Sequence, residues 1–199
     1  MKLPLRLALP IALAMALSAC LGSLMGGGKA PPTLLTLTSE APMPADATRS
    51  SSAGQAVTIA LPIVAKEIRT IRVPARVSPT EVAYVKDLQW VDTPDRLFQD
   101  LLAETVRRTT GRVVLDPKQA TLDPGVVVSG QLFQFGYDAA AQSVIVRFDG
   151  ALTTNGGARV ETRRFEARVP ASGDAASVGP ALNQAANQVA LEAASWIGR

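Results

Sequence analysis

The chain has 199 residues, of which 47% are hydrophobic and 19% charged, and this is enough apolar material for one packed domain. It contains no histidine and one cysteine, which excludes histidine-based catalysis, intramolecular disulfides and Cys/His zinc sites. The net charge of +3 includes Lys2 and Arg6, which lie in a segment that we expect to be removed. The mature chain is therefore almost neutral, and its charge does not favour binding of nucleic acid.

The first twenty residues have the plan of a bacterial export signal. Two basic residues precede an apolar run over residues 7–17, and small residues follow. The tetrapeptide Leu-Ser-Ala-Cys at 17–20 resembles a lipobox, in which the cysteine is acylated and becomes the first residue of the mature chain. We predict that residues 1–19 are a cleaved lipoprotein signal peptide and that Cys20 is the lipidation site.

Two other interpretations of this segment remain open. The charge-free stretch 7–28 approaches the length of a membrane span, which needs about 20 apolar residues, but Pro10 and the glycines at 26–28 dilute it. The second alternative is an ordinary secreted protein in which the cysteine occurs by chance. The position of Cys20 and the lack of a second cysteine favour the lipobox. More than one acyl chain, such as palmitate, would give stable anchoring.

Residues 20–55 are expected to hold the lipidated cysteine, a tether and a short first strand. The tether is rich in Gly, Ser, Ala and Pro, and such a composition buries too little apolar surface to offset its ordering entropy. It is expected to be flexible or loosely laid on the surface. Within it, residues 33–38 have strand character and are expected to join the sheet of a domain that spans residues 56–199.

The sequence of the first half of the domain predicts short strands followed by one helix. Extended segments are expected at 57–61, 68–73 and 82–85. Thr93 is a suitable N-cap, and Pro94 occupies the first helical position. The helix over 94–110 carries one apolar stripe and ends at Gly111.

The second half predicts strands at 113–115, 126–137, 143–153 and 159–169, followed by a helix over 177–197. Asn155-Gly156 predicts a tight hairpin turn, because both residues tolerate positive φ. In the returning strand Val160 and Phe165 fall on opposite parities, which predicts a bulge between them. The apolar stripe of the last helix is rich in alanine. It is expected to pack closely on the sheet or on the first helix, with a partner helix as the alternative.

These elements together predict an α+β two-layer sandwich, with a mainly antiparallel sheet and two helices packed on one face.

Taken in order, these features resemble the ABC-type transport auxiliary lipoprotein family, also called the PqiC- or YmbA-like lipoproteins. The resemblance rests on the lipobox at 17–20, the early strand 33–37, the region 82–94 with Tyr84, Trp90 and Pro94, the stretches 130–135 and 181–185, and Trp196-Ile197 near the end. It departs from the family pattern in the early strand, where leucine replaces the usual aromatic residue, and in its glycine-rich tether.

The resemblance implies a role without catalysis. Family members accompany ABC transporter subunits and periplasmic MCE-domain proteins that move phospholipid or other apolar molecules between the inner and outer membranes. The lipoprotein is expected to dock on the MCE assembly from the outer membrane, facing the periplasm, because Leu21 rather than aspartate follows the cysteine. Neither a metal nor a cofactor is expected, and tethering would raise the effective concentration of the docking domain.

Candidate partner-binding residues are Phe133, Phe135 and Tyr137, together with Trp90. The first three share one parity of a strand, so they form either an exposed aromatic patch or part of the core beneath a helix. Trp90 is either a binding residue or a core residue that flanks the first helix. Arginine pairs at 107–108 and 163–164 could meet lipid headgroups or an acidic partner, or simply be solvated.

Three alternatives to a transport role belong to other classes. Catalysis by a carboxylate pair would use Asp92 with Asp95 or Glu161 with Glu166, but the chain has no phosphate-binding glycine loop and no Gly-x-Ser-x-Gly elbow. An outer-membrane lipoprotein that assists lipopolysaccharide or β-barrel assembly is the second. A structural envelope lipoprotein is the third.

Overall fold

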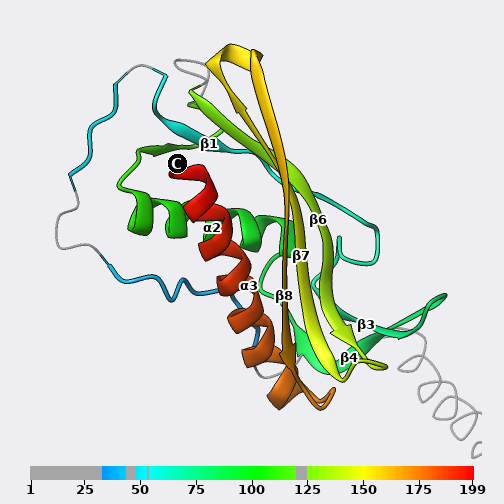
Figure 1. Ribbon diagram of the computed structural model, residues 1–199. Helices are drawn as coiled ribbons and strands as arrows, with labels where there is room; N and C mark the ends of the chain where they lie inside the picture. Colours follow the sequence, from blue (N-terminus) through cyan, green and yellow to red (C-terminus); the bar gives the residue numbers. More distant parts are fainter. Residues whose placement is uncertain (1–32, 44–47, 53, 120–124) are drawn as a thin grey trace, which may run out of the picture. The chain divides into compact units, whose positions relative to one another are not determined.

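The computed structural model describes residues 33–43, 48–52, 54–119 and 125–199. Thr33–Arg199 forms one compact unit. The predicted lipidation site Cys20 lies outside the described residues. Figure 1 shows the elements, which in chain order are β1 (Val57–Ile59), β2 (Ile63–Val64), β3 (Arg72–Ser78), β4 (Glu81–Gln89), α2 (Pro94–Thr110), β5 (Val114–Leu115), β6 (Val126–Asp138), β7 (Ser143–Thr154), the short 3-10 turn η1 (Asn155–Gly157), β8 (Arg159–Pro170) and α3 (Ala175–Ile197).

β6 is the centre of an eight-stranded mixed sheet. On one side it pairs antiparallel with β7, which pairs antiparallel with β8. On the other side three short strands, β1, β2 and β3, pair with it one after another in the parallel direction. β5 extends the sheet beyond β1, and β4 extends it beyond β3. The sheet is therefore antiparallel in its longest pairings and parallel where short segments lie along β6.

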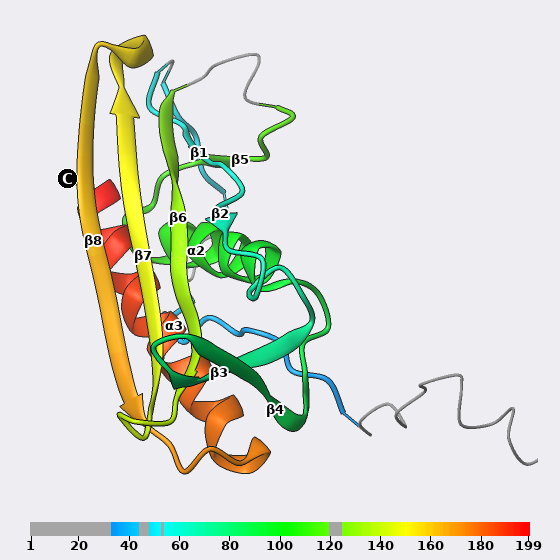
Figure 2. The same ribbon diagram turned by 90° about the vertical axis from the view of Figure 1, so that its right-hand side faces the viewer.

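Both helices lie on the same face of this sheet. In Figure 2 the strands β6, β7 and β8 stand in front of α2 and α3, so this view looks at the face without helices, called the open face below. The helices and the inner faces of the strands enclose one hydrophobic core. The predicted α+β two-layer architecture is confirmed.

Helix α2 forms where its terminal signals place it. Thr93 precedes it with extended dihedrals, Pro94 opens it, and Gly111 closes it in the left-handed conformation with φ of 67°. The stripe predicted from the sequence is buried, including Phe98 and Leu102. The side chain of Thr93 makes no capping hydrogen bond, so the helix start depends on Pro94 and burial.

Helix α3 packs on the sheet and on α2 through small side chains. Its buried face is rich in alanine, and its larger members are Val178, Leu182, Val189, Trp196 and Ile197. Alanine lets two helices approach closely, which explains why α3 contacts both α2 and the strands β7 and β8. Aromatic rings connect the layers: Phe165 lies with its ring centroid 5.5 Å from that of Trp196 and 6.4 Å from that of Phe148.

The β7–β8 hairpin turns where Asn155-Gly156 predicts it. Asn155 and Gly156 have positive φ, 53° and 61°, but the predicted two-residue turn does not form. Thr154 pairs with Arg159, so the loop has four residues, 155–158, and includes η1. The bulge predicted in β8 is wrong, because β8 pairs with β7 in one continuous register. Phe165 faces the core opposite Phe148, and Val160 lies exposed on the open face opposite Thr153.

The chain does contain a bulge in this layer, and it lies in β6. The pairing of β6 with β7 shifts between Leu132 and Gln134, so that Phe133 has no partner in the ladder. Because side chains alternate between the two faces of a strand, one extra residue changes which parity points inward. Leu132 is buried before the bulge and Phe135 after it.

Two early segments differ from their predictions. The expected strand 33–38 makes one isolated parallel bridge, Leu35 with Trp90. The expected strand 68–73 is a turn through its first residues, and β3 begins only at Arg72. Both segments are short, and whether such a segment becomes a strand depends on the strands of the same chain that lie beside it.

Candidate docking surface on the open face of the sheet

The bulge in β6 separates the aromatic residues that the sequence places together. Phe135 faces the core, where its ring centroid lies 5.5 Å from that of Trp90, and both residues are buried. Tyr137 is partly buried and packs against the same core. Phe133 alone is exposed, at 44%. Of the two alternatives for these residues, the core holds for Phe135 and in part for Tyr137, whereas Phe133 is the candidate that lies on the surface.

Phe133 is held in place by an arginine from the neighbouring strand. The guanidinium carbon of Arg147 on β7 lies 4.0 Å from the centroid of the Phe133 ring, a distance suited to a cation–π contact. Glu166 on β8 approaches Arg147 with an N–O distance of 3.7 Å. The Nε of Arg147 is buried, and no described residue accepts a hydrogen bond from it. This Nε is therefore an unpaired donor beneath the surface, and the exposed part of the Arg147–Phe133 contact is the Phe133 ring.

A small recess lies between Phe133 and the β3–β4 hairpin. Its walls come from the turn before β3, from both hairpin strands, from β6 and from β7; they include Glu67, Pro74, Val82, Gln134 and Ile145. Its volume is about 40 Å³, and a cavity needs roughly 10–15 Å³ to hold one water. The recess is too small for a lipid tail, but it can receive the tip of one side chain.

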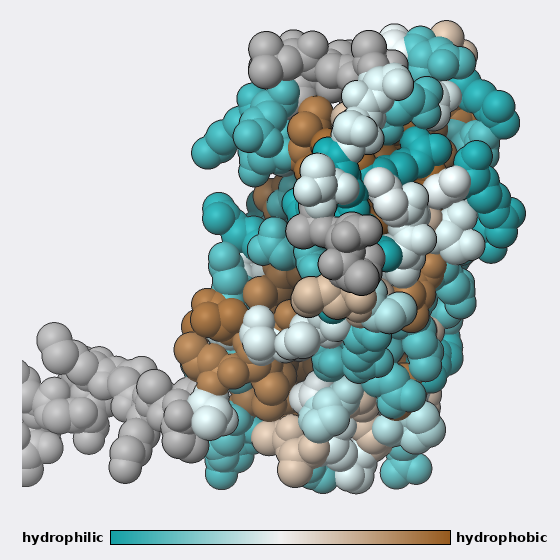
Figure 3. Space-filling model, turned by 90° about the vertical axis from the view of Figure 1, so that its left-hand side faces the viewer, coloured by the Kyte–Doolittle hydropathy of each residue, from teal (hydrophilic) through white to brown (hydrophobic). Residues whose placement is uncertain are grey.

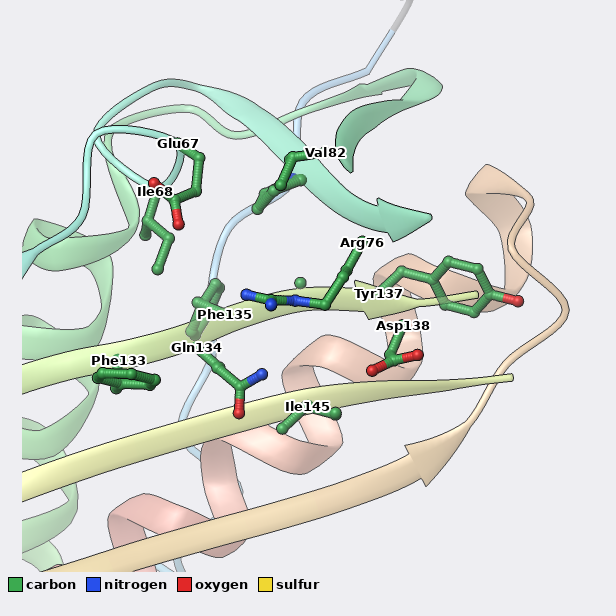
Figure 4. A pocket seen from close by; sticks show the side chains of 12 residues that line it. Glu67, Ile68, Arg76, Val82, Phe133, Gln134, Phe135, Tyr137, Asp138 and Ile145 are labelled. Carbon is green, nitrogen blue, oxygen red and sulfur yellow. The ribbon is translucent and has the colours of Figure 1, made fainter. Parts of the chain in front are cut away.

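Arg76 brings a second cation to this recess. Figure 4 shows its side chain lying along β6 with the guanidinium turned away from Asp138. In the described part of the chain, the Arg76 side chain has neither a hydrogen-bond partner nor an ion pair. Together with Phe133 and Arg147, it makes a surface that combines exposed apolar area with unpaired donors. Interfaces are enriched in aromatic residues and arginine, so this surface, called the Phe133 surface below, is the candidate for docking.

A larger open groove, of about 490 Å³, lies along α2 beside β5. Its lining mixes Arg96, Arg107 and Lys118 with Asp100 and Asp116. Apolar residues of β1, β5 and α2 also line it, but the groove contains no aromatic side chain. It is the weaker candidate for a binding site.

Residues 33–41 form a strap that crosses the helices. Thr38 donates its backbone N–H to the Asn183 side chain over 3.0 Å, and Glu40 donates its own to the Asn187 side chain over 2.8 Å. Asn187 in turn donates to the carbonyl oxygen of Thr38 over 2.9 Å. Two asparagines one helical turn apart on α3 therefore hold the strap as a neighbouring strand would.

Helix α2 holds the end of the strap. Arg108 donates to the carbonyl oxygens of Ser39 and Ala41 at 3.3 and 3.0 Å. It also donates from Nε to Glu104 at 2.6 Å, and this hydrogen bond keeps the pKa of Glu104 below its ordinary value. The sequence patterns did not predict that residues 33–41 lie on the two helices. The signal was present, because Asn187 lies within the apolar stripe of its helix, where an amide needs partners.

The two carboxylate pairs considered for catalysis lie in different settings, and Asp95 is buried at the start of α2 with no described residue donating a hydrogen bond to its Oδ1. Asp92 accepts from the N–H of Thr93 at the start of α2. Glu161 and Glu166 lie opposite Leu152 and Arg147 in an unbroken register, which puts them on opposite faces of β8.

Electrostatics also do not indicate an acid catalyst. In the described part of the chain, the carboxyl groups with a resolved shift, at Glu104, Asp149 and Asp174, all have lowered pKa values. Hydrogen bonds are the main cause, from Arg108, Arg164 and Ser172 respectively. A general acid requires a raised pKa. The described residues also hold no cluster of three or more metal-binding side chains.

A family model described as ABC-type transport auxiliary lipoprotein component matches residues 35–194. The crystal structure of protein XCC0632 from Xanthomonas campestris, of family DUF330, is 22% identical, with a TM-score of 0.64 over 82% of this chain and 92% of that one. A crystal structure of an uncharacterized protein is 12% identical, with a TM-score of 0.57 over 84% and 98%. At these identities the two structures show a shared fold. The search of curated proteins gave no match.

The helices in the described part of the chain are too short or too polar to cross a bilayer.

Proposed function

Because the chain belongs to the family of ABC-type transport auxiliary lipoprotein components, we propose that it is the lipid-anchored docking component of an MCE-type transport system. The system would move phospholipid or another apolar substrate between the inner and outer membranes. In this proposal the lipoprotein is attached to the outer membrane through acylated Cys20, faces the periplasm, and binds the MCE-domain protein that works with the ABC transporter subunits. The observation that carries the proposal is the family match across the folded domain.

The geometry supports a docking role without catalysis or lipid transport by this chain alone. The recess beside Phe133 measures about 40 Å³, which suits the side chain of a protein partner rather than a lipid. Phe133 supplies apolar area, and Arg76 supplies donors at its edge. Partner carboxylates or carbonyl oxygens would satisfy these donors, so we assign the Phe133 surface to the MCE-domain protein.

The test is a pull-down of the lipidated protein from detergent-solubilised envelopes, with mass spectrometry of its partners and of its N-terminal peptide. The wild-type protein is expected to recover an MCE-domain protein with ABC subunits and to carry an acylated Cys20. Phe133→Ala should reduce recovery by roughly tenfold or more, as removal of an aromatic anchor does at other interfaces. Cys20→Ala should remove the protein from the membrane fraction.

The matched control is Val160→Ala, because Val160 is an exposed apolar residue on the same open face but far along β8. It should leave recovery unchanged. Recovery of a β-barrel assembly or of peptidoglycan in place of transport subunits would overturn the proposal in favour of an assembly or structural lipoprotein. Equal recovery with Phe133→Ala and wild type would reject the Phe133 surface.

A further inference from the structure

A second group of exposed apolar side chains lies where the strap begins. It consists of Leu34, Ile71 and Val91, which are 50%, 42% and 55% exposed. In the space-filling view of Figure 3, apolar side chains gather beside the start of the described chain. These three residues are called the end patch below.

Backbone hydrogen bonds place the three segments of the end patch side by side. The N–H of Val91 donates to the carbonyl oxygen of Leu35 over 2.8 Å, and the N–H of Trp90 donates to that of Ile71 over 2.7 Å. Trp90 is buried beneath this junction. The end patch is therefore built on the core and cannot collapse into it to hide its own apolar area.

The length of chain before the strap indicates what covers the end patch. Residues 21–32 separate the predicted lipidation site from Thr33, and a chain of that length spans at most about 45 Å when fully extended. The strap holds residues 38–41 on α2 and α3, so the folded domain begins at Thr33 and not after residue 55. The exposed apolar side chains of the end patch therefore lie beside the residue at which the connection to the predicted anchor begins.

We propose that the end patch rests on the lipid bilayer that carries the anchor. This inference depends on the proposed function, because it requires acylated Cys20. The anchor supplies the affinity, and the short connection raises the effective concentration of the end patch at the lipid surface, so a weak contact suffices. Apolar side chains then enter the boundary between headgroups and acyl chains.

This contact is hydrophobic rather than electrostatic. The segments 66–72 and 86–92, which carry Ile71 and Val91, together hold four basic and three acidic side chains; the basic ones predominate in 66–72 and the acidic ones in 86–92. A contact driven by anionic lipid would need an excess of lysine and arginine. The contact should therefore change little with salt or with the fraction of anionic lipid. In this arrangement the domain is held at the segment where the strap begins.

The experiment uses an environment-sensitive fluorophore on the lipidated full chain. Because Cys20 would be acylated and is the only cysteine, a cysteine introduced by Val91→Cys becomes the single free thiol. The labelled protein is reconstituted into phosphatidylethanolamine–phosphatidylglycerol vesicles, with and without a lipid that carries a quencher in its upper acyl chain. We expect a blue shift and a roughly twofold loss of emission with the quencher, because the label enters the lipid boundary.

Val160→Cys is the matched control, since Val160 is an equally exposed valine on the open face. Its label should show neither change. Adding Leu34→Ser and Ile71→Ser to Val91→Cys should remove most of the quenching while the protein stays in the vesicle fraction. Equal quenching at positions 91 and 160, or none at 91 in membrane-bound protein, would overturn the inference.

Two other occupants give different results. A label at position 91 that responds only when purified transport complex is added would show that the end patch binds protein. A response that depends on protein density in the vesicle, without quenching by lipid, would show contact with a second copy. Both would overturn the lipid assignment. If mass spectrometry finds Cys20 unmodified and the protein leaves the vesicles, the proposed anchor itself fails, which is a separate outcome.

Discussion

Asn187 shows how one polar residue inside an apolar helix face can determine the course of a distant segment. It is 1% exposed, and its amide group bonds the N–H of Glu40 and the carbonyl oxygen of Thr38 at the same time. Its amide nitrogen also reaches the carbonyl oxygen of Asn183. Alanine at this position would fit the neighbouring stripe but leave the strap without its partners.

We therefore predict that Asn187→Ala lowers the free energy of unfolding by about 1–3 kcal/mol, the usual effect of leaving buried polar groups unpaired. Amide hydrogen exchange at residues 38–40 should rise together with this loss. Urea denaturation and exchange mass spectrometry measure both quantities. The control is Gln188→Ala, whose side chain is exposed on the same helix. Unchanged exchange in the strap of the Asn187 variant would contradict the prediction.

Phe133 and Phe135 show the limit of counting positions along a strand. Both were candidates because they share a parity with Tyr137, and the alternation rule assigns them to one face. The bulge at Phe133 separates them: Phe135 lies against Trp90 in the core, and Phe133 lies under Arg147 on the open face. No residue type in β6 marks the bulge, since it results from the pairing of two strands.

At the scale of elements, the β7–β8 hairpin keeps its open face polar with cross-strand ion pairs. Arg164 donates two hydrogen bonds of 2.8 Å to the two carboxylate oxygens of Asp149. Glu166 pairs with Arg168 and lies near Arg147. β8 is the last strand on its side of the sheet, and charged side chains along such an edge discourage pairing with other chains.

The ion pair between Asp149 and Arg164 predicts how the stability of the fold depends on pH. The hydrogen bonds from Arg164 lower the pKa of Asp149 from its ordinary value of 3.8. A lowered pKa in the folded state stabilises the fold above the ordinary value, and this stabilisation is lost as pH falls through the folded pKa. The pair is partly exposed, so its contribution at neutral pH should stay below about 1 kcal/mol.

Asp149→Asn should therefore lose a little stability at neutral pH and show a smaller drop than wild type between neutral pH and about pH 3. Urea midpoints at the two pH values measure this difference. Arg164→Ala removes the other partner and should reduce the drop in the same way, whereas Thr162→Ala on the same strand should not. An equal drop in wild type and in both pair variants would refute the assignment.

The same hairpin shows which elements can be predicted. Asn155-Gly156 predicts the position of the turn, because both residues tolerate positive φ, and the structure has positive φ at both. The loop is longer than predicted, since Thr154 pairs with Arg159. The bulge predicted in β8 rested on Val160, an apolar residue that simply lies exposed near the turn. Turn chemistry is local and can be predicted from residue types. The inward or outward position of one apolar side chain depends on what covers that part of the sheet.

At the scale of the whole molecule, the strap belongs to the folded domain. Leu35 and Leu37 pack against the core from outside the predicted domain segment 56–199, and the strap reaches both helices. The family match begins at residue 35, in agreement with this packing. The folded domain therefore begins at Thr33, next to the end patch.

We predict that a chain of residues 33–199 unfolds in one transition, with the same urea midpoint as residues 20–199. A chain of residues 42–199 lacks the strap and should lose about 2–4 kcal/mol, because apolar packing and several hydrogen bonds disappear together. Chemical denaturation followed by tryptophan fluorescence measures both, and Trp90 lies directly beneath the strap bridge. Equal stability of the two shortened chains would show that the strap is not part of the cooperative fold.

The sequence by itself determined the architecture, the boundaries of both helices, the hairpin turn and the family. These features depend on periodicity, terminal signals and turn residues, which act over a few neighbouring positions. Only the tertiary structure decided that Phe133 is exposed while Phe135 is buried, that Asn183 and Asn187 hold a strap some 145 residues away, and that Leu34, Ile71 and Val91 meet in one patch. Strand register and contacts between distant segments produce these features, and both arise only when the chain packs as a whole.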